Sequence, residues 1–203
     1  LVDNNPKVPS RIAVLVEGHG ESPAPVLVQM AQNLERAGAD LLAIPCNTAH
    51  AYLDHIRGAV AIPVLDMIQM TAHRLTELPS EPKTVGVIAS SAVLKTELYG
   101  QALEACGLDV VLPVAADQDA VMVLIKKVKS GQVSTADHQR FSDIANGLVE
   151  SGAQGIAVAC TDLSVMGQDH LIIDVPLVDA LDVLTEAIVA CVGQFAQSPA
   201  RES

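Results

Sequence analysis

The sequence predicts an α/β fold in which parallel strands are joined by crossover helices. Short runs rich in Val and Ile alternate along the chain with stretches whose apolar residues recur at helical spacing. The length of 203 residues allows one large domain or two small ones, and either can bury a core of its own. The expected strands are Ile12–Val16, Leu41–Pro45, Ile62–Leu65, Thr84–Ala89, Asp109–Leu112, Gly155–Ala159 and Ile172–Val178.

Three of the helices between and after these strands have clear limits. The first is expected over Val26–Ala37 and ends before Gly38, a residue that suits a helix C-terminus. A second presents one buried face between Phe141 and Val149, where apolar residues recur three and four positions apart. The last helix is expected from about Ala180 to Phe195.

An internal repeat divides the chain into two related halves. Gly38 and Cys46 of the first half recur as Gly152 and Cys160, each pair 114 positions apart (38 to 152, 46 to 160). Each unit runs helix, Gly, strand, Cys, helix, Pro-containing strand and Asp. The repeat therefore predicts two α/β units of similar construction.

The repeat and a Pro-rich linker near Leu78–Pro82 suggest the domain limits. Residues 1–79 together with 180–203 are expected to form the first domain, and residues 80–179 the second. The second half opens with Thr84–Ala89, and the counterpart of that strand would lie before Leu1. The first domain is therefore expected to lack its first strand.

Charge and composition exclude several classes of partner. With 24 acidic and 12 basic residues the net charge is −12, and the basic residues are scattered, which argues against nucleic-acid binding. No apolar run approaches the ~18 residues of a membrane span. Four cysteines are too few for a disulfide framework in a chain of this length. We therefore expect a cytoplasmic protein with neither a nucleic-acid nor a membrane partner.

Cys46 and Cys160 end equivalent predicted strands, at the edge of a parallel sheet where ligands bind. A helix that starts after each cysteine would favour a thiolate and would bind a carboxylate. Asn47, Thr48 and Thr161 follow the two thiols and can donate hydrogen bonds to such a carboxylate.

Two acid/base groups on opposite sides of one carbon fit stereoinversion, because one removes a proton and the other returns one to the opposite face. The alternative is that each cysteine is only a small buried apolar residue, as we expect for Cys106 and Cys191. The polar residues that follow Cys46 and Cys160 favour the catalytic interpretation.

Several segments resemble the aspartate/glutamate racemases. The run Pro45-Cys46-Asn47-Thr48-Ala49-His50 is similar to their first signature, and Ala159-Cys160-Thr161-Asp162-Leu163 to their second. The segments Asn4–Arg11, Ile62–Asp66 and Ile88–Ser90 also look like that family. The resemblance implies two pseudo-symmetric Rossmann-like domains with parallel four-stranded sheets, and an active site in the cleft between them. It also implies a homodimer and racemisation without pyridoxal phosphate or any other cofactor.

The resemblance also assigns roles to residues of this chain. Cys46 and Cys160 are the paired bases that racemise a small amino acid, aspartate first and glutamate next. The substrate-binding residues it implies are Arg11, Asn47, Thr48, Ser90, Lys129 and Thr161, with Lys127 as the alternative to Lys129. Without the resemblance, a surface position explains Arg11 equally well, and a solvated helix end is the better explanation of Lys127 and Lys129.

Two features depart from this pattern or leave its meaning open. Asp162 stands where the family usually has Glu. His50, four residues after Cys46, could pair with that cysteine or bind a metal, but local capping or hydrogen bonding explains it better because no further ligands have zinc spacing. The competing functions are a non-catalytic dicarboxylate-binding or dimerising scaffold and a broad-specificity amino-acid or hydantoin racemase.

Overall fold

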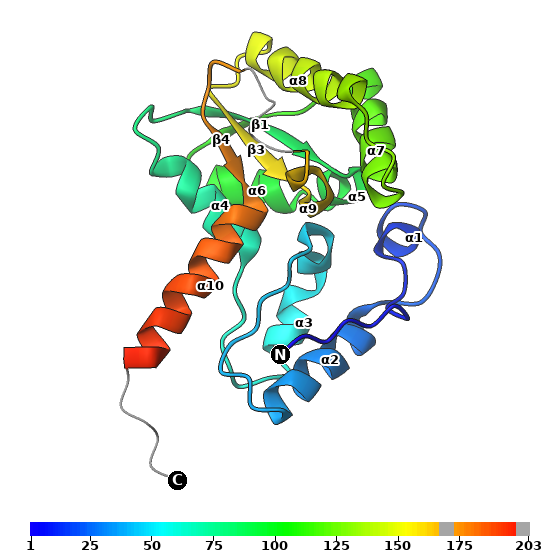
Figure 1. Ribbon diagram of the computed structural model, residues 1–203, viewed down its shortest axis with the longest axis vertical. Helices are drawn as coiled ribbons and strands as arrows, with labels where there is room; N and C mark the ends of the chain where they lie inside the picture. The colour runs from blue at the N-terminus through cyan, green and yellow to red at the C-terminus, as the bar shows by residue number, and fades with distance from the viewer. Residues whose placement is uncertain (167–172, 198–203) are drawn as a thin grey trace.

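A computed structural model describes residues 1–166 and 173–197 and confirms the α/β class (Figure 1). Its sheet has four parallel strands in the order β2-β1-β3-β4, all from the second half of the chain. They are β1 (Thr84–Ala89), β2 (Asp109–Val111), β3 (Gly155–Ala159) and β4 (Leu177–Asp179).

The strand predictions for the second half are confirmed, with small differences at the edges. The limits of β1 and β3 agree with the prediction, and β2 ends one residue early. The strand expected over Ile172–Val178 is described only from Leu177 to Asp179, and Ile172 lies outside the described residues.

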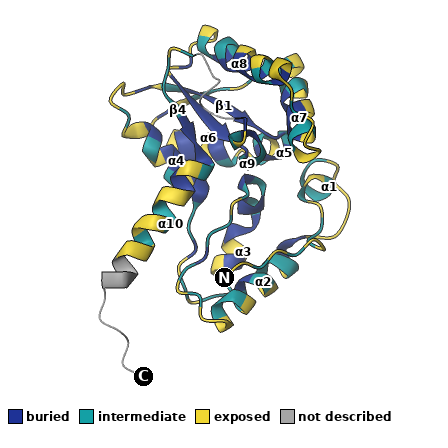
Figure 2. Ribbon diagram, in the orientation of Figure 1, coloured by how far each residue is buried: buried dark blue, intermediate teal, exposed yellow. Residues whose placement is uncertain are grey.

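Helices cover both faces of this sheet, which explains why β1 and β3 are nearly continuous apolar runs (Figure 2). One face packs against α4 (Met67–Thr76), α6 (Leu98–Ala105) and the start of α10 (Ala180–Gln197). The other packs against α7 (Ala115–Lys129) and α8 (Thr135–Glu150). Gly86 of β1 allows α8 to approach closely, because a Cβ there would lie 3.0 Å from the Leu148 side chain of that helix.

The first half contains α1 (Arg11–Leu15), α2 (Ala24–Arg36), η1 (Asn47–Tyr52) and α3 (Leu53–Arg57). The strand predicted at Ile12–Val16 is wrong, since that segment forms α1. The Ser10 hydroxyl accepts a hydrogen bond from the Ala13 N–H at 3.3 Å and caps the helix. A short apolar run fits either element, and here the cap decides between them.

The two strands expected at Leu41–Pro45 and Ile62–Leu65 are reduced to one parallel bridge between Leu42 and Val64. The Leu42 N–H donates to the Pro63 carbonyl at 2.8 Å, and the Leu65 N–H donates to the Leu42 carbonyl at 2.9 Å. Among the described residues no third segment pairs with these two, so the ladder does not extend. A small core of Ala31, Leu42, Leu53, Ile56 and Val64 holds the segments against α2 and α3.

The two halves are joined through α4 and α10, which pack against each other. Met67 of α4 is buried with Ala180 and Leu184 of α10 in one cluster. The helices α5 (Ser91–Lys95) and α9 (Thr161–Ser164) follow β1 and β3 and face the first half (Figure 1). The division at residues 79 and 180 stays a prediction. None of the described helices combines the length and the apolar character that crossing a membrane requires.

Candidate active site

A cavity of about 190 Å³ lies between the two halves, at the carboxyl ends of β1 and β3. Both apolar and polar side chains line this cavity. All eight residues singled out in the sequence are among them: Arg11, Cys46, Asn47, Thr48, Ser90, Lys129, Cys160 and Thr161. The structure thus brings the predicted residues together, while their roles stay a prediction.

Cys46 is the extended residue before η1, with φ −154° and ψ 107°, and its side chain is half-buried. The nearest cation is Arg11, whose Nη2 donates to the Cys46 sulfur at 3.9 Å. Arg11 belongs to α1, so the helix that replaced the expected strand carries a positive charge to the first thiol.

His50 holds the backbone of Cys46. Its Nε2 accepts from the Met67 N–H at 3.1 Å, so the ring proton is on Nδ1, which donates to the Cys46 carbonyl at 3.0 Å. Burial lowers the pKa of His50 below its ordinary value of 6.5, which keeps the ring neutral. The local hydrogen bonding expected for His50 is confirmed.

Cys160 lies in a different environment. It is only 8% exposed, and its thiol donates to Asp162 Oδ2 at 3.9 Å. The same oxygen is 3.2 Å from Lys129 Nζ. Burial, with a further contribution from the Asp162 carboxylate, raises the pKa of Cys160 to about 11.

The expectation that the helix start would favour a thiolate is therefore wrong at Cys160. Removal from water outweighs the opposing effects of the Asp162 and Leu163 N–H groups and of Lys129. The following helix, α9, has only four residues, so few peptide dipoles are aligned behind the thiol.

Asn47 is buried, and a residue from the other half of the chain hydrogen-bonds to its side-chain amide. Its Oδ1 accepts from the Tyr99 hydroxyl of α6 at 2.7 Å. Its Nδ2 is buried without a hydrogen-bond partner. Because Asn47 lines the cavity, this N–H₂ group is available to a ligand oxygen. Sequence analysis missed Tyr99, because a hydrogen bond to a residue 52 positions away has no local signal.

Three residues with hydroxyl groups also line the cavity. Thr161 Oγ1 donates to the Pro45 carbonyl at 3.3 Å, which joins the two cysteine-bearing turns. Ser90 Oγ accepts from the Val93 N–H at 3.4 Å and so caps α5. Thr48 is half-buried at the cavity wall.

The two candidate lysines of α7 point to different places. Lys129 lines the cavity, whereas Lys127 donates to Asp137 Oδ1 at 2.5 Å. That bond and those from Ser134 lower the pKa of Asp137 to about 2. Lys127 therefore pairs with Asp137 of the capping box at the start of α8, and Lys129 is the lysine that lines the cavity.

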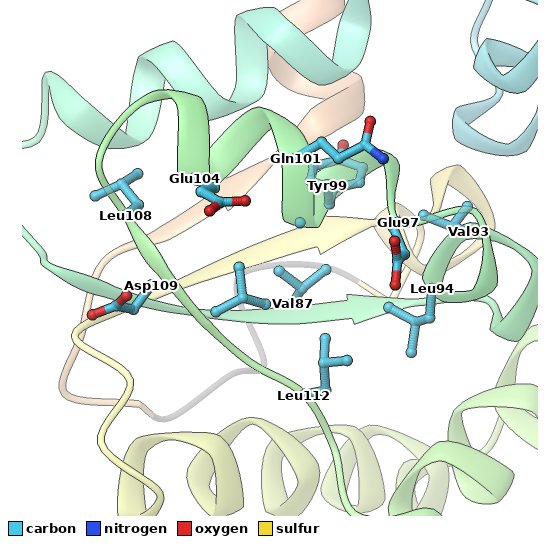
Figure 3. A pocket seen from close by; sticks show the side chains of 12 residues that line it. Val87, Val93, Leu94, Glu97, Tyr99, Gln101, Glu104, Leu108, Asp109 and Leu112 are labelled. Carbon is cyan, nitrogen blue, oxygen red and sulfur yellow. The ribbon is translucent and has the colours of Figure 1, made fainter.

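A second, larger cavity of about 460 Å³ lies between β1, β2, α5 and α6 (Figure 3). Val87 and Leu112 contribute apolar surface there, and Glu97, Glu104 and Asp109 contribute carboxylates. Among the described residues that line it there is no thiol and no basic side chain, in contrast to the cavity with the two cysteines. Nowhere in the described part of the chain do three or more His, Cys, Asp or Glu residues form a possible metal site.

Comparison with known proteins points to one family. A family model described as Asp/Glu/Hydantoin racemase matches residues 1–188 of this chain. The chain is 29% identical over 167 residues to the broad-specificity amino-acid racemase RacX of Bacillus subtilis (strain 168), covering 81% of this chain and 70% of RacX. It is 28% identical over 124 residues to a glutamate racemase of Sulfurihydrogenibium sp. (strain YO3AOP1), covering 60% of this chain and 46% of that enzyme.

Solved structures show the same two-domain fold. The aspartate racemase of Picrophilus torridus superposes with a TM-score of 0.80 at 27% identity, over 94% of this chain and 78% of that one. A glutamate racemase of Francisella tularensis subsp. tularensis SCHU S4, in complex with D-glutamate, gives a TM-score of 0.68 at 20% identity. That match covers 95% of this chain and 69% of the Francisella chain.

Proposed function

The chain belongs to the Asp/Glu/Hydantoin racemase family, and from that premise we propose that it interconverts L- and D-aspartate by moving the Cα proton between Cys46 and Cys160. Family membership makes it an isomerase of the amino-acid racemase type. The observation that carries the mechanism is the cavity itself, where two thiols from equivalent positions of the two halves line the same small space.

The proposed reaction needs one sulfur as base and the other as acid. The Cys46 sulfur, beside the Arg11 guanidinium, takes the Cα proton as a thiolate. Cys160, whose raised pKa of about 11 keeps its proton on sulfur, donates it to the opposite face of the carbon. The electron pair left at Cα passes to the substrate carboxylate and returns to form the new C–H bond. For the other enantiomer the two sulfurs exchange roles.

The carboxylate must be held while it takes up this charge. The unpartnered Asn47 Nδ2 and the Thr48 hydroxyl are the donors that we assign to the substrate's carboxylate. Thr161 Oγ1, whose proton goes to the Pro45 carbonyl, accepts from the substrate's amino group. Ser90 shares this task from the end of β1. Every group in these steps belongs to the chain, so the proposal includes no cofactor.

Arg11 and Lys129 support an acidic side chain on the substrate. In a chain of net charge −12, a dicarboxylic amino acid requires local cations, and these two residues line the cavity from opposite halves. A guanidinium suits a carboxylate because it can bind both oxygens. Aspartate is our first candidate and glutamate the second.

A broad-specificity racemase is the second candidate function. It is favoured by the similarity to RacX and by the ion pair between Lys129 and Asp162, which engages one of the two cations. The proposal also includes a cytoplasmic location and a homodimer. Light scattering of the purified protein tests the dimer directly.

Proton NMR in deuterated water tests the function. We expect the Cα proton signals of L- and D-aspartate to disappear on incubation with the protein, and each enantiomer to yield the other. Protein alkylated with iodoacetamide is the control and should leave both signals intact. Retention of the Cα proton in both enantiomers of aspartate, glutamate and alanine would overturn the proposal.

A further inference from the structure

We propose that Asp162 determines the substrate range, because it competes with an acidic side chain of the substrate for Lys129. This inference rests on the proposed function and names a selectivity residue of the same site. Asp162 Oδ2 is 3.2 Å from Lys129 Nζ and 3.9 Å from the Cys160 sulfur. It thus joins the cation of α7 to the second thiol.

The charges around the cavity explain the competition. Among its described lining residues, Arg11 and Lys129 are basic and Asp162 is acidic. Arg11 pairs with no carboxylate in the described part of the chain and donates only to the Cys46 sulfur, so it remains available to a substrate. Lys129 already has a carboxylate partner. A substrate side-chain carboxylate at Lys129 must share the ammonium with Asp162 and meets its repulsion.

The same cavity offers an uncharged surface for a neutral side chain. Ile12 of α1, Val93 of α5, and Met122 and Ile125 of α7 line it together with the polar groups. An aliphatic side chain gains apolar contact there and has no need of Lys129. With Asp162 in place, the site therefore accepts neutral amino acids alongside acidic ones.

A different role for Asp162 would act on Cys160 alone. Its carboxylate contributes to the raised pKa of that thiol, and such an effect changes the rate for every substrate by the same factor. Competition for Lys129 instead changes the ratio of rates between an acidic and a neutral substrate. The ratio therefore separates the two roles.

The first experiment measures kcat/KM for Cα proton exchange with L-aspartate and with L-alanine. In Asp162→Asn we expect the ratio of aspartate to alanine to rise about tenfold, since one repulsive charge is removed beside Lys129. The variant Lys129→Gln should lower the ratio, and adding Asp162→Asn to it should raise the ratio by less than the same substitution does in the parent protein. A ratio in Asp162→Asn within twofold of the parent value would overturn the proposal.

The other lysine pair of α7 offers a matched control. Asp137→Asn removes the carboxylate partner of Lys127, two residues from Lys129 but outside the cavity. It changes the net charge by the same amount and should leave the ratio unchanged. An equal rise in Asp137→Asn would assign the effect to net charge and overturn the role of Asp162.

Binding of substrate-like acids tests the inference without turnover. Calorimetry with succinate and with propionate should show that Asp162→Asn tightens succinate about tenfold and leaves propionate within twofold. Absence of Cα proton exchange in the parent protein would refute the proposed function, yet the succinate-to-propionate ratio would still decide the role of Asp162. Equal changes for both acids would refute the inference while leaving the racemase function intact.

Discussion

Cys46 and Cys160 occupy equivalent positions in the two halves of the chain, yet their surroundings differ in burial and in charge. Cys46 is half-buried beside the Arg11 guanidinium, whereas Cys160 is buried beside the Asp162 carboxylate. Burial raises the pKa of Cys160 to about 11. The internal repeat thus supplies two thiols, and the unlike residues around them place one beside a cation and the other beside a carboxylate.

The scaffolds behind the two thiols differ as well. Cys160 follows β3, which is hydrogen-bonded on both sides in a four-stranded sheet. Cys46 follows a segment that has one bridge to its neighbour. Its position depends instead on local backbone bonds, such as that from the Cys46 N–H to the Ile44 carbonyl at 2.7 Å, and on side-chain bonds from His50 to its carbonyl and from Thr161 to Pro45. The first thiol is therefore held by local bonds and side chains, and the second by the sheet.

Removal of either thiol should have the largest effect. We expect Cys46→Ala and Cys160→Ala each to lower the racemisation rate by about 10²–10⁴-fold, the usual contribution of a positioned acid or base. Polarimetry or chiral chromatography of aspartate measures it. Cys106→Ala is the control, because Cys106 lies outside the cavity. Racemisation at the parent rate by either cavity variant would disprove the two-thiol mechanism.

Alkylation should reveal the raised pKa of Cys160. A pKa of about 11 instead of 9.0 leaves Cys160 with about 100-fold less thiolate at neutral pH than an ordinary thiol. Peptide mapping after brief iodoacetamide treatment should show Cys46 modified first. The Cys160 rate should rise about tenfold per pH unit between pH 7 and 10, because deprotonation increases towards the pKa. A Cys160 rate that equals that of Cys46, or that stops rising by pH 9, would contradict the asymmetry.

The same titration affects stability. The folded protein binds the Cys160 proton more tightly than the unfolded chain, so the contribution is complete below pH 9. It is lost as the pH rises from about 9 towards 11. Urea unfolding of the parent and of Cys160→Ser across this range should show a steeper loss of stability for the parent.

A substitution of Arg11, in the first half of the chain, should affect aspartate more than alanine. Arg11→Ala should weaken kcat/KM for aspartate about 10- to 100-fold more than for alanine, the value of a charge-assisted hydrogen bond. Because Arg11 also contacts the Cys46 sulfur, its loss can lower the rate for both substrates, and the ratio between the two substrates is free of that shared change. Steady-state kinetics with both amino acids checks it. Equal losses for the two would take Arg11 out of side-chain recognition.

Tyr99 should give the smallest effect. Tyr99→Phe removes the donor to Asn47 Oδ1 and should raise the KM for aspartate by up to about tenfold, because the freed amide can rotate. Tyr52→Phe is the matched control, since the Tyr52 hydroxyl is buried without a partner and its loss should leave KM unchanged. A KM in Tyr99→Phe no higher than in Tyr52→Phe would show that Asn47 needs no support from α6.

Sequence was most informative where local pattern and packing agree. β1 and β3 were predicted with their limits because both are short apolar runs buried on two faces. The strand at Ile12–Val16 failed because its neighbours supply a helix cap and no strand to pair with. Two further strands were reduced to the bridge at Leu42 because a ladder depends on partners that a sequence pattern does not contain.

The residues of the site also fall into those that the sequence identified and those that it missed. The repeat identified both thiols and the residues next to them in sequence, and the structure places these around one cavity. Side chains that act across the fold had no local signal. Tyr99 contacts Asn47 from 52 positions away, and Asp162 contacts Lys129 from another helix. The raised pKa of Cys160 likewise depends on burial, which a single sequence does not measure.

The most direct test of the two-thiol account follows Cα deuterium exchange into L- and D-aspartate with each single-cysteine variant. If each sulfur serves one face of Cα, Cys46→Ala should exchange the proton of one enantiomer only, and Cys160→Ala that of the other. Exchange of both enantiomers by one variant, or of the same enantiomer by both, would contradict the account.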